Sequence, residues 1–128
     1  MQFIALIYQN ENIQKNFSKE EWGKIYVEYQ AVGKELTEKG QLLAGYGLQP
    51  TLAGKTVQSQ EGRVSVQDGP AYRTEDSLSA VNVIEAPDME TALQIAGKFP
   101  SVRWGSIEVR PVMQYKSTSV ETYKTVRA

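Results

Sequence analysis

Apolar side chains recur along the chain either at every residue or second residue or at every third or fourth residue. These spacings predict which segments form strands and which form helices. Residues 2–8, QFIALIY, are apolar on both alternating faces, which predicts a strand buried on both sides. Over residues 18–39 the apolar positions recur every three or four residues, which predicts an amphipathic helix. Ser18 begins a capping-box pattern, Phe17 is placed to pack on the first turn, and Gly40 suits a left-handed helix end.

The rest of the chain predicts more strands and one more helix. Asp88 is a suitable N-cap for a helix that begins with METALQIA, and Phe99-Pro100 is expected to end it. Glu61-Gly62 joins two short alternating segments, which indicates a β-hairpin. The expected strands are 41–50, 55–60, 63–67, 79–86 and 104–114, and a polar loop is expected at 9–16. This order predicts an α+β, ferredoxin-like βαββαβ fold with an antiparallel sheet and a β-hairpin insertion.

The two predicted helices can cover only one face of such a sheet. The strand at 2–8 is nevertheless apolar on both faces, so the second face also has to be covered. A second copy of the chain is the simplest cover, because a stable interface buries about 800 Å² per partner. The pattern therefore predicts a homodimer that forms through the open face of the sheet.

Composition excludes several classes of function. The 128 residues suit one domain, and the net charge of −1 offers no basic field for nucleic acid. The chain has neither Cys nor His, so any general acid or base must be Asp, Glu, Lys, Tyr or water. The carboxylates lack the spacing of a metal-binding loop, and no metal or cofactor is expected. The apolar start is too short for a signal peptide or a membrane span, so a cytoplasmic protein is expected.

The segment QDGPAYRTED, residues 67–76, carries the first group of candidate site residues. Asp68-Gly69 suits a turn in which the glycine takes a positive φ. In one interpretation this is a structural corner, where the Asp68 carboxylate accepts hydrogen bonds from local backbone amides. In the other, the corner sets Asp68 at the mouth of a cleft beside Tyr72 and Arg73.

The last predicted strand carries the second group. Its two-residue period places Glu108 and Arg110 on the same face. They form either a solvated or interfacial ion pair, or a partly desolvated pair between two dimer sheets that orients a small polar ligand. Tyr8 and Tyr46, near the ends of the first two strands, are placed to line the same gap.

Several of these segments together resemble a known family. They are LIY at 6–8, GLQP at 47–50, Asp68-Gly69-Pro70, EAPDMETALQIA at 85–96 and IEVRPVM at 107–113. The chain resembles the YCII-related proteins of the DGPF type over residues 1–113, which leaves 114–128 as a C-terminal tail. The resemblance implies a ferredoxin-like fold and a homodimer in which two sheets form an α/β barrel.

The chain also departs from that family. Ala71 stands where the family usually has Phe, Arg73 stands where an acidic residue is common, and Ser79-Ala80 replaces a glycine pair. Better-known relatives are thought to use a His–Asp pair, and that chemistry cannot operate in a chain without His.

Three functions follow as hypotheses. The first is a small-molecule-binding or accessory homodimer without His-based catalysis. The second is an enzyme with Asp68 or Glu108 as general base, and with Arg73 or Arg110 steadying an anion in the transition state. The third, a regulatory module that contacts a transcription factor, is implied only by the association of some family members with alternative sigma factors. The tail is either frayed or lies on a partner subunit.

Overall fold

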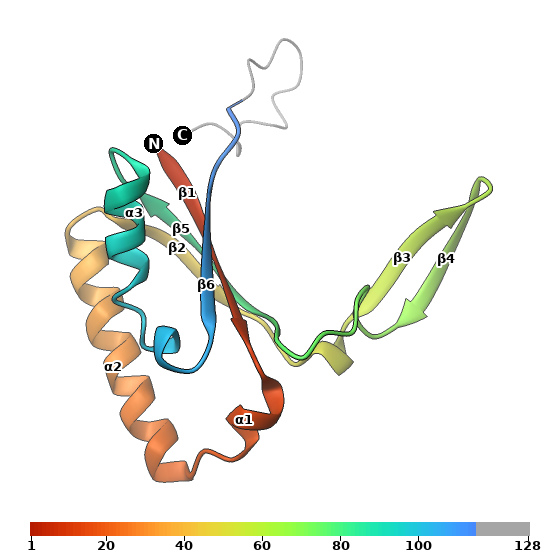
Figure 1. The fold of residues 1–128 in the computed structure, drawn as a ribbon, viewed down its shortest axis with the longest axis horizontal. Coiled ribbons are helices and arrows are strands. Elements are labelled where there is room, and N and C mark those ends of the chain that lie inside the picture. The colour runs from red at the N-terminus through yellow and green to blue at the C-terminus, as the bar shows by residue number, and fades with distance from the viewer. Residues whose placement is uncertain (115–128) are drawn as a thin grey trace.

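The computed structural model describes residues 1–114 and folds them into one four-stranded sheet, a layer of helices and a projecting hairpin (Figure 1). The sheet has the order β2-β5-β1-β6, and every pair of neighbours is antiparallel. This is the order of a ferredoxin-like fold, so the predicted α+β class is confirmed. The elements are β1 (Gln2–Gln9), α1 (Glu11–Lys15), α2 (Lys19–Glu38), β2 (Leu42–Gly47), η1 (Thr51–Ala53), β3 (Lys55–Gln60), β4 (Arg63–Asp68), β5 (Ser77–Glu85), α3 (Met89–Ala96), η2 (Pro100–Arg103) and β6 (Ser106–Pro111).

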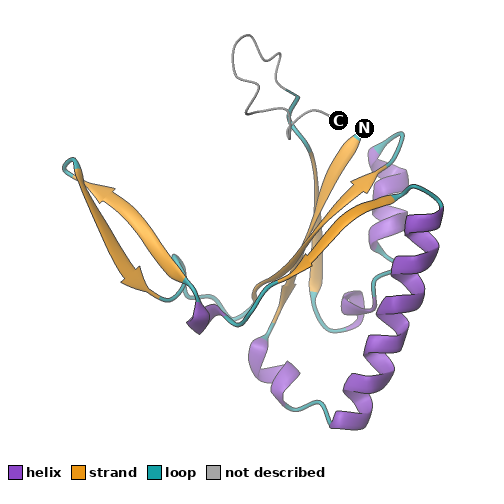
Figure 2. Cartoon of the chain, turned by 180° about the vertical axis from the view of Figure 1, so that it is seen from behind, coloured by secondary structure: helices purple, strands orange, loops and turns teal. Residues whose placement is uncertain are grey.

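Helices α2 and α3 lie on one face of the sheet, as the views from the two sides show (Figures 1 and 2). The core between them buries the alternate β1 residues Phe3, Ala5 and Ile7. Helix α2 contributes the buried side chain of Leu36 to this core, and α3 contributes Ala92, Ile95 and Ala96. Ile84 and Phe99 also belong to the core. Apolar burial against the sheet is the main reason that these helices are stable, because in proteins most helix stability comes from packing of an apolar face, and an isolated helix as short as the eight residues of α3 is marginal in water.

The expected start of α2 is confirmed. The Ser18 hydroxyl accepts a hydrogen bond from the Glu21 amide, and the Glu21 carboxylate accepts one from the Ser18 amide, both at 3.0 Å. Phe17 packs edge-on against Trp22, with 5.3 Å between ring centroids, which is the staple contact across the first turn. Gly40, with φ of 70°, follows the helix end in the left-handed conformation.

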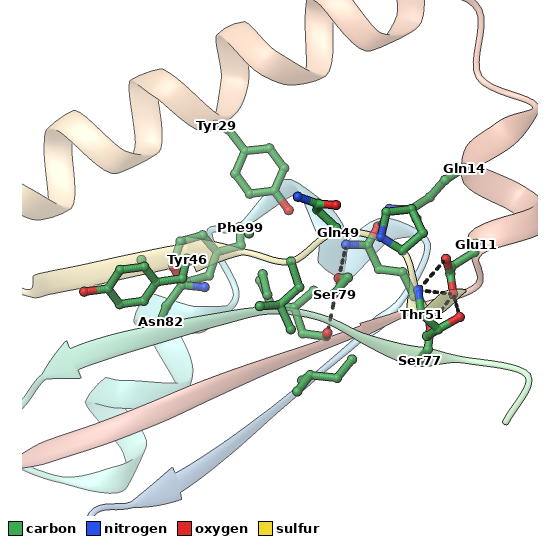
Figure 3. Close-up of a pocket in the computed structure, with 18 of the residues that line it drawn as sticks. Glu11, Gln14, Tyr29, Tyr46, Gln49, Thr51, Ser77, Ser79, Asn82 and Phe99 are labelled. Carbon is green, nitrogen blue, oxygen red and sulfur yellow. Dashed lines mark hydrogen bonds between the residues drawn. The ribbon is translucent and has the colours of Figure 1, made fainter. Parts of the chain in front are cut away.

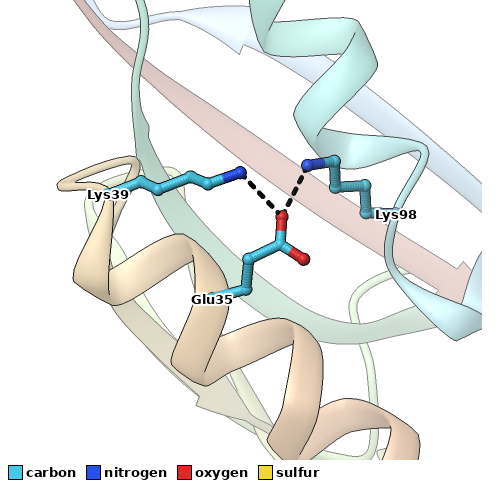
Figure 4. A network of polar contacts seen from close by, with 3 residues as sticks. All are labelled: Glu35, Lys39 and Lys98. Atoms are coloured by element: carbon cyan, nitrogen blue, oxygen red, sulfur yellow. Dashed lines mark hydrogen bonds and ion pairs between the residues drawn. The ribbon is translucent and has the colours of Figure 1, made fainter.

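Ion pairs tie α2 to the segments that follow α3. The Glu35 carboxylate accepts hydrogen bonds from Lys39 at 3.1 Å and from Lys98 at 2.7 Å (Figure 4). The Lys98 ammonium, helped by Lys39, holds the pKa of Glu35 below its ordinary value. Since all three side chains are exposed, the pairs orient the helices and add little to the free energy of unfolding.

The other face of the sheet, called the open face below, carries no helix. The strand register places Ile4 beside Val83 and Leu6 beside Val81, and Tyr8 follows on the same face. These positions are half-buried, although no element of residues 1–114 covers them. The predicted burial of the first strand is therefore confirmed on the helix-covered face, whereas burial of the open face stays a prediction.

Strands β3 and β4 form a separate two-stranded sheet, called the arm below, that projects from the body (Figures 1 and 2). Its register pairs Lys55 with Asp68 at the base and Gln60 with Arg63 at the tip. Glu61 and Gly62 have φ of 51° and 79°. Two positive φ values are typical of a tight hairpin turn that matches strand twist, so the predicted turn is confirmed.

Two expectations at the element level are wrong. Residues 9–16, expected as a loop, contain the short helix α1, which Asn10 caps by accepting a hydrogen bond from the Asn12 amide at 2.9 Å. The predicted strand 41–50 ends at Gly47, and 48–54 forms a linker that contains η1. Within residues 1–114, no helix has both the length and the apolar character to cross a membrane. The tail expected at 114–128 lies, beyond its first residue, outside the described residues.

Candidate functional site

A pocket of about 430 Å³ lies between α2 and the helix-covered face of the sheet, where β2 ends and β5 begins (Figure 3). It is called the helix-side pocket below. Its apolar floor and wall include Ile7, Leu42, Leu48 and Phe99. Its polar lining consists of hydroxyl and amide side chains and one carboxylate: Gln9, Glu11, Gln14, Tyr29, Tyr46, Gln49, Thr51, Ser77, Ser79 and Asn82. Tyr46 is the one ligand-binding candidate of the sequence analysis that lines this pocket. Such a mixture of apolar walls and a few fixed polar groups is typical of small-molecule sites.

Glu11 closes the α1 end of the pocket. Its carboxylate accepts hydrogen bonds from the Thr51 hydroxyl at 2.7 Å, from the Thr51 amide at 3.3 Å and from the Ser77 hydroxyl at 3.1 Å. These donors, the Thr51 hydroxyl above all, hold the pKa of Glu11 below its ordinary value. The carboxylate therefore joins α1, the linker and the start of β5, which are far apart in sequence.

Gln9 lies at the centre of a second set of hydrogen bonds. Its side-chain oxygen accepts from the Trp104 indole and from the Gln14 amide, both at 2.6 Å. Its side-chain nitrogen donates to the Ser79 hydroxyl at 2.7 Å, and Ser79 donates to the carbonyl of Ile7 at 3.2 Å. A buried amide whose partners are all present is fixed in orientation, so Gln9 forms a rigid polar part of the floor.

Asn82 differs from Gln9 because its side chain has no partner. It lies on β5 between Ala5 and Gly45, is 9% exposed, and lines the pocket. Its carboxamide makes no side-chain hydrogen bond within residues 1–114, and its polar atoms, unlike the fully buried and unpaired Gln41 Oε1 and Ser101 Oγ, reach the open space of the pocket. A Cβ at position 45 would lie 2.5 Å from the Asn82 oxygen, so any side chain there would force the Asn82 carboxamide to turn. The carboxamide is therefore a buried polar group that a bound ligand can satisfy.

Helix α2 forms the roof of the pocket. Tyr29 points from the helix towards the sheet (Figure 3), and burial raises the pKa of its hydroxyl. Gly33, one turn further along, also lines the pocket, and a Cβ there would meet nothing within 4 Å. Glycine inside a helix costs about 1 kcal/mol relative to alanine, and packing does not require it here. What Gly33 provides is open space above the pocket.

A second cavity, of about 760 Å³, lies on the other side of the linker and is called the arm-base cavity. Residues 48–51 and 77–78 line both cavities and separate them. Tyr8 and Leu78 contribute from the sheet, and Gly69 and Pro70 contribute from the corner that ends β4. The arm-base cavity is therefore the angle between the arm and the open face.

Four of the six candidate site residues lie on the open face. The register places Tyr8 beside Leu78, Tyr46 beside Val81, Glu108 beside Leu6 and Arg110 beside Ile4. Glu108 and Arg110 face one another loosely, with 3.8 Å between charged atoms and side chains 51% and 70% exposed. Their expected common face is thus observed, and neither residue lines the helix-side pocket, the arm-base cavity or the cavity beside Arg73.

The two other candidates lie at the base of the arm. Asp68 is 87% exposed and forms an ion pair with Lys55 across the hairpin. The expectation that its carboxylate accepts from local backbone amides is wrong, because the corner is held by Gly69, whose amide donates to Gly54 and whose carbonyl accepts from the Thr56 hydroxyl, both at 2.8 Å. Gly69 has φ of 89°, as expected. Arg73 lines a smaller cavity of about 230 Å³ with Glu11 and Tyr72.

The sequence pattern did not predict most of the residues that line the helix-side pocket. Gln9, Glu11 and Asn82 come from three elements, and no spacing along the chain brings them together. The apolar alternation of β1 and β5 contained the one available signal, because Gln9 and Asn82 occupy positions where the period requires a buried residue. In residues 1–114, no three acidic side chains gather in a way that would hold a metal ion.

Comparison with known proteins agrees with this fold. The family model described as the YCII-related domain matches residues 1–116. An uncharacterized protein of Rhizobium meliloti (strain 1021) is 31% identical over 118 residues, which cover 91% of this chain and 95% of that protein. The match includes both cavities, the arm and the whole sheet. The chain therefore belongs to the family of YCII-related proteins.

Proposed function

We propose that this YCII-related protein is a homodimer that binds a small, uncharged polar molecule in the helix-side pocket. The carboxamide of Asn82 carries this proposal, since the residue is only 9% exposed and presents polar atoms, free of any side-chain hydrogen bond within residues 1–114, to a cavity large enough for a ligand. A volume of 430 Å³ lies within the range of about 300–1,000 Å³ that is usual for small-molecule sites. The lining offers amide and hydroxyl groups, which match a ligand with its own donors and acceptors.

The state of Glu11 favours binding over carboxylate catalysis in this pocket. Glu11 is the one charged side chain of the lining in the part of the chain described. A general base at neutral pH needs a raised pKa, but the hydrogen bonds from Thr51 and Ser77 lower the pKa of Glu11. The alternative bases, Asp68 and Glu108, have exposed side chains and do not line any of the three cavities described above, so they support an enzyme less well.

The homodimer would form through the open face. A row of half-buried apolar side chains (Ile4, Leu6, Val81 and Val83) runs across the two central strands and has no cover within residues 1–114. Glu108 and Arg110 lie at its β6 edge. In a two-fold dimer the same patch meets itself, so Glu108 of one protomer can face Arg110 of the other. A second copy would thus bring apolar side chains against the apolar row and opposite charges against Glu108 and Arg110.

A thermal-shift screen of small uncharged amides, sugars and heterocycles would test the ligand. A ligand at 100 times its dissociation constant raises the free energy of unfolding by about 2.7 kcal/mol, which is easily measured. Gly33→Met would place a side chain over the pocket and abolish the shift. Gly23→Met is the matched control, since Gly23 lies on the same helix, has equally open space and does not line the pocket.

Asn82→Ala gives the second arm of this test. It should weaken the binding of any hit at least tenfold, because the ligand loses its buried partner. A screen without hits, or a hit that binds the Gly33→Met and Gly23→Met proteins equally well, would contradict the proposed site. Sedimentation equilibrium tests the dimer separately: the wild type should sediment as a dimer, and Leu6→Lys as a folded monomer.

A further inference from the structure

The arm has two chemically different faces, and neither packs on the body. Val57 lies directly opposite Val66, and Val64 follows on the same face. Their side chains are 64%, 61% and 71% exposed. The opposite face is polar and consists of Thr56, Gln58, Gln60, Arg63, Ser65 and Gln67. A two-stranded hairpin alone in water is marginally stable at best, so this valine face calls for a cover.

The direction of the arm indicates what covers it. The helices lie on one side of the sheet, and the arm extends away from the opposite side, which is the side of the open face (Figures 1 and 2). Tyr8 and Leu78 of the open face line the arm-base cavity together with Gly69 and Pro70. The open face and the arm are therefore continuous, and a molecule that covers the first lies beside the second.

The area required by a stable dimer supports the same partner. The four strands lie about 4.8 Å apart and have six to nine residues each; over a common length of six residues, at about 3.3 Å per residue, they present roughly 400 Å² of open face. A stable interface buries about 800 Å² per partner, so sheet against sheet supplies about half. One face of a hairpin with two six-residue strands offers roughly 200 Å² more. Each protomer buries such a face twice, with its own arm and beneath the partner's arm, and the total then reaches the required area.

We propose that the arm is an intersubunit clamp, whose valine face packs on the flank of a second copy of this chain and whose base is closed by that copy. This proposal rests on the proposed homodimer and adds to it. The partner would also close the open side of the arm-base cavity, so that this cavity is complete only in the dimer. The Lys55–Asp68 ion pair lies at the base of the valine face and keeps the two strands in register there.

The test replaces the valine face without disturbing the hairpin. Threonine is β-branched and favours strands as valine does, so Val57→Thr, Val64→Thr and Val66→Thr together keep the arm and remove its apolar surface. Gln58→Thr, Ser65→Thr and Gln67→Thr form the matched control on the polar face. Sedimentation equilibrium should show a dimer dissociation constant raised about 100-fold by the valine set, because six apolar side chains leave the interface, and unchanged by the control set. Circular dichroism confirms that both variants fold.

The possible outcomes distinguish the proposal that the arm is a clamp from the proposal that the protein is a homodimer. A dimer that is as tight with the valine set as with the control set overturns the clamp and leaves the homodimer standing. A wild-type protein that sediments as a monomer at all concentrations overturns both.

A cross-link identifies the partner. Since the chain has no Cys, a benzophenone attached to Val64→Cys is unique. It should give a cross-linked dimer, and the same probe on Ser65→Cys should give much less. A link within one chain, for example to residues 115–128, would contradict the clamp.

Discussion

Glu11 illustrates how a single polar residue can position a site. Its carboxylate joins Thr51 and Ser77, so the linker and the start of β5 are held against α1. The linker is the common wall of the helix-side pocket and the arm-base cavity. A change at Glu11 therefore affects both cavities, although the residue itself is a poor base.

Replacing Glu11 with Gln should lower the free energy of unfolding by about 1 kcal/mol at neutral pH, because charge-assisted hydrogen bonds are stronger than neutral ones. The folded pKa of Glu11 is lowered, so its stabilisation is complete above the ordinary value of 4.5 and is lost as the pH falls through the folded pKa. Urea titrations of the two proteins should therefore differ at pH 7 and converge below pH 4.5. A difference that persists at low pH would mean that the carboxylate charge is not responsible.

At the scale of helices and strands, the sequence predicts those features that depend on residues close together in the chain. The capping box at Ser18, the cap at Asp88 and the positive φ of Gly69 are all visible in neighbouring residues, and the structure confirms them. Helix α1 was missed because five residues with one apolar side chain carry no helical period. The pocket was missed for another reason: its polar groups meet only after β1, β5 and the linker have come together.

The turn of the arm allows a direct test at this scale. Glu61 adopts φ of 51°, which asparagine tolerates better than glutamate does, and Asn-Gly is the preferred pair for such turns. Glu61→Asn should stabilise the arm by about 0.5–1 kcal/mol. Amide hydrogen exchange should slow in residues 55–68 and remain unchanged in the central strands. Equal slowing throughout the sheet would show that the arm unfolds together with the body and not separately.

At the scale of the whole molecule, one face of the sheet is covered by helices and the other face is not. The helix layer buries its core and pairs its surface charges, as in the contact of Glu28 with Arg103 at 2.7 Å and 3.0 Å. The open face instead carries half-buried apolar side chains, and the arm carries three exposed valines. An apolar sheet face without a helix over it favours association, although α2 and α3 also expose Tyr26, Val27 and Leu93, and two-fold symmetry lets one surface serve both partners.

Substitutions of Glu108 and Arg110, at the edge of the open face, test whether the dimer has two-fold symmetry across this face. In a two-fold dimer, Glu108→Arg would place like charges opposite one another and weaken the dimer, about tenfold or more at low salt. Combining it with Arg110→Glu exchanges the two charges within each chain, so that opposite charges again meet across the axis and the dimer should recover. Sedimentation at 50 mM and 500 mM salt measures both effects, and the defect of the single variant should shrink at high salt. If the single and double variants dimerise equally well, this edge does not lie at the dimer interface, and the two sheets do not meet along β6.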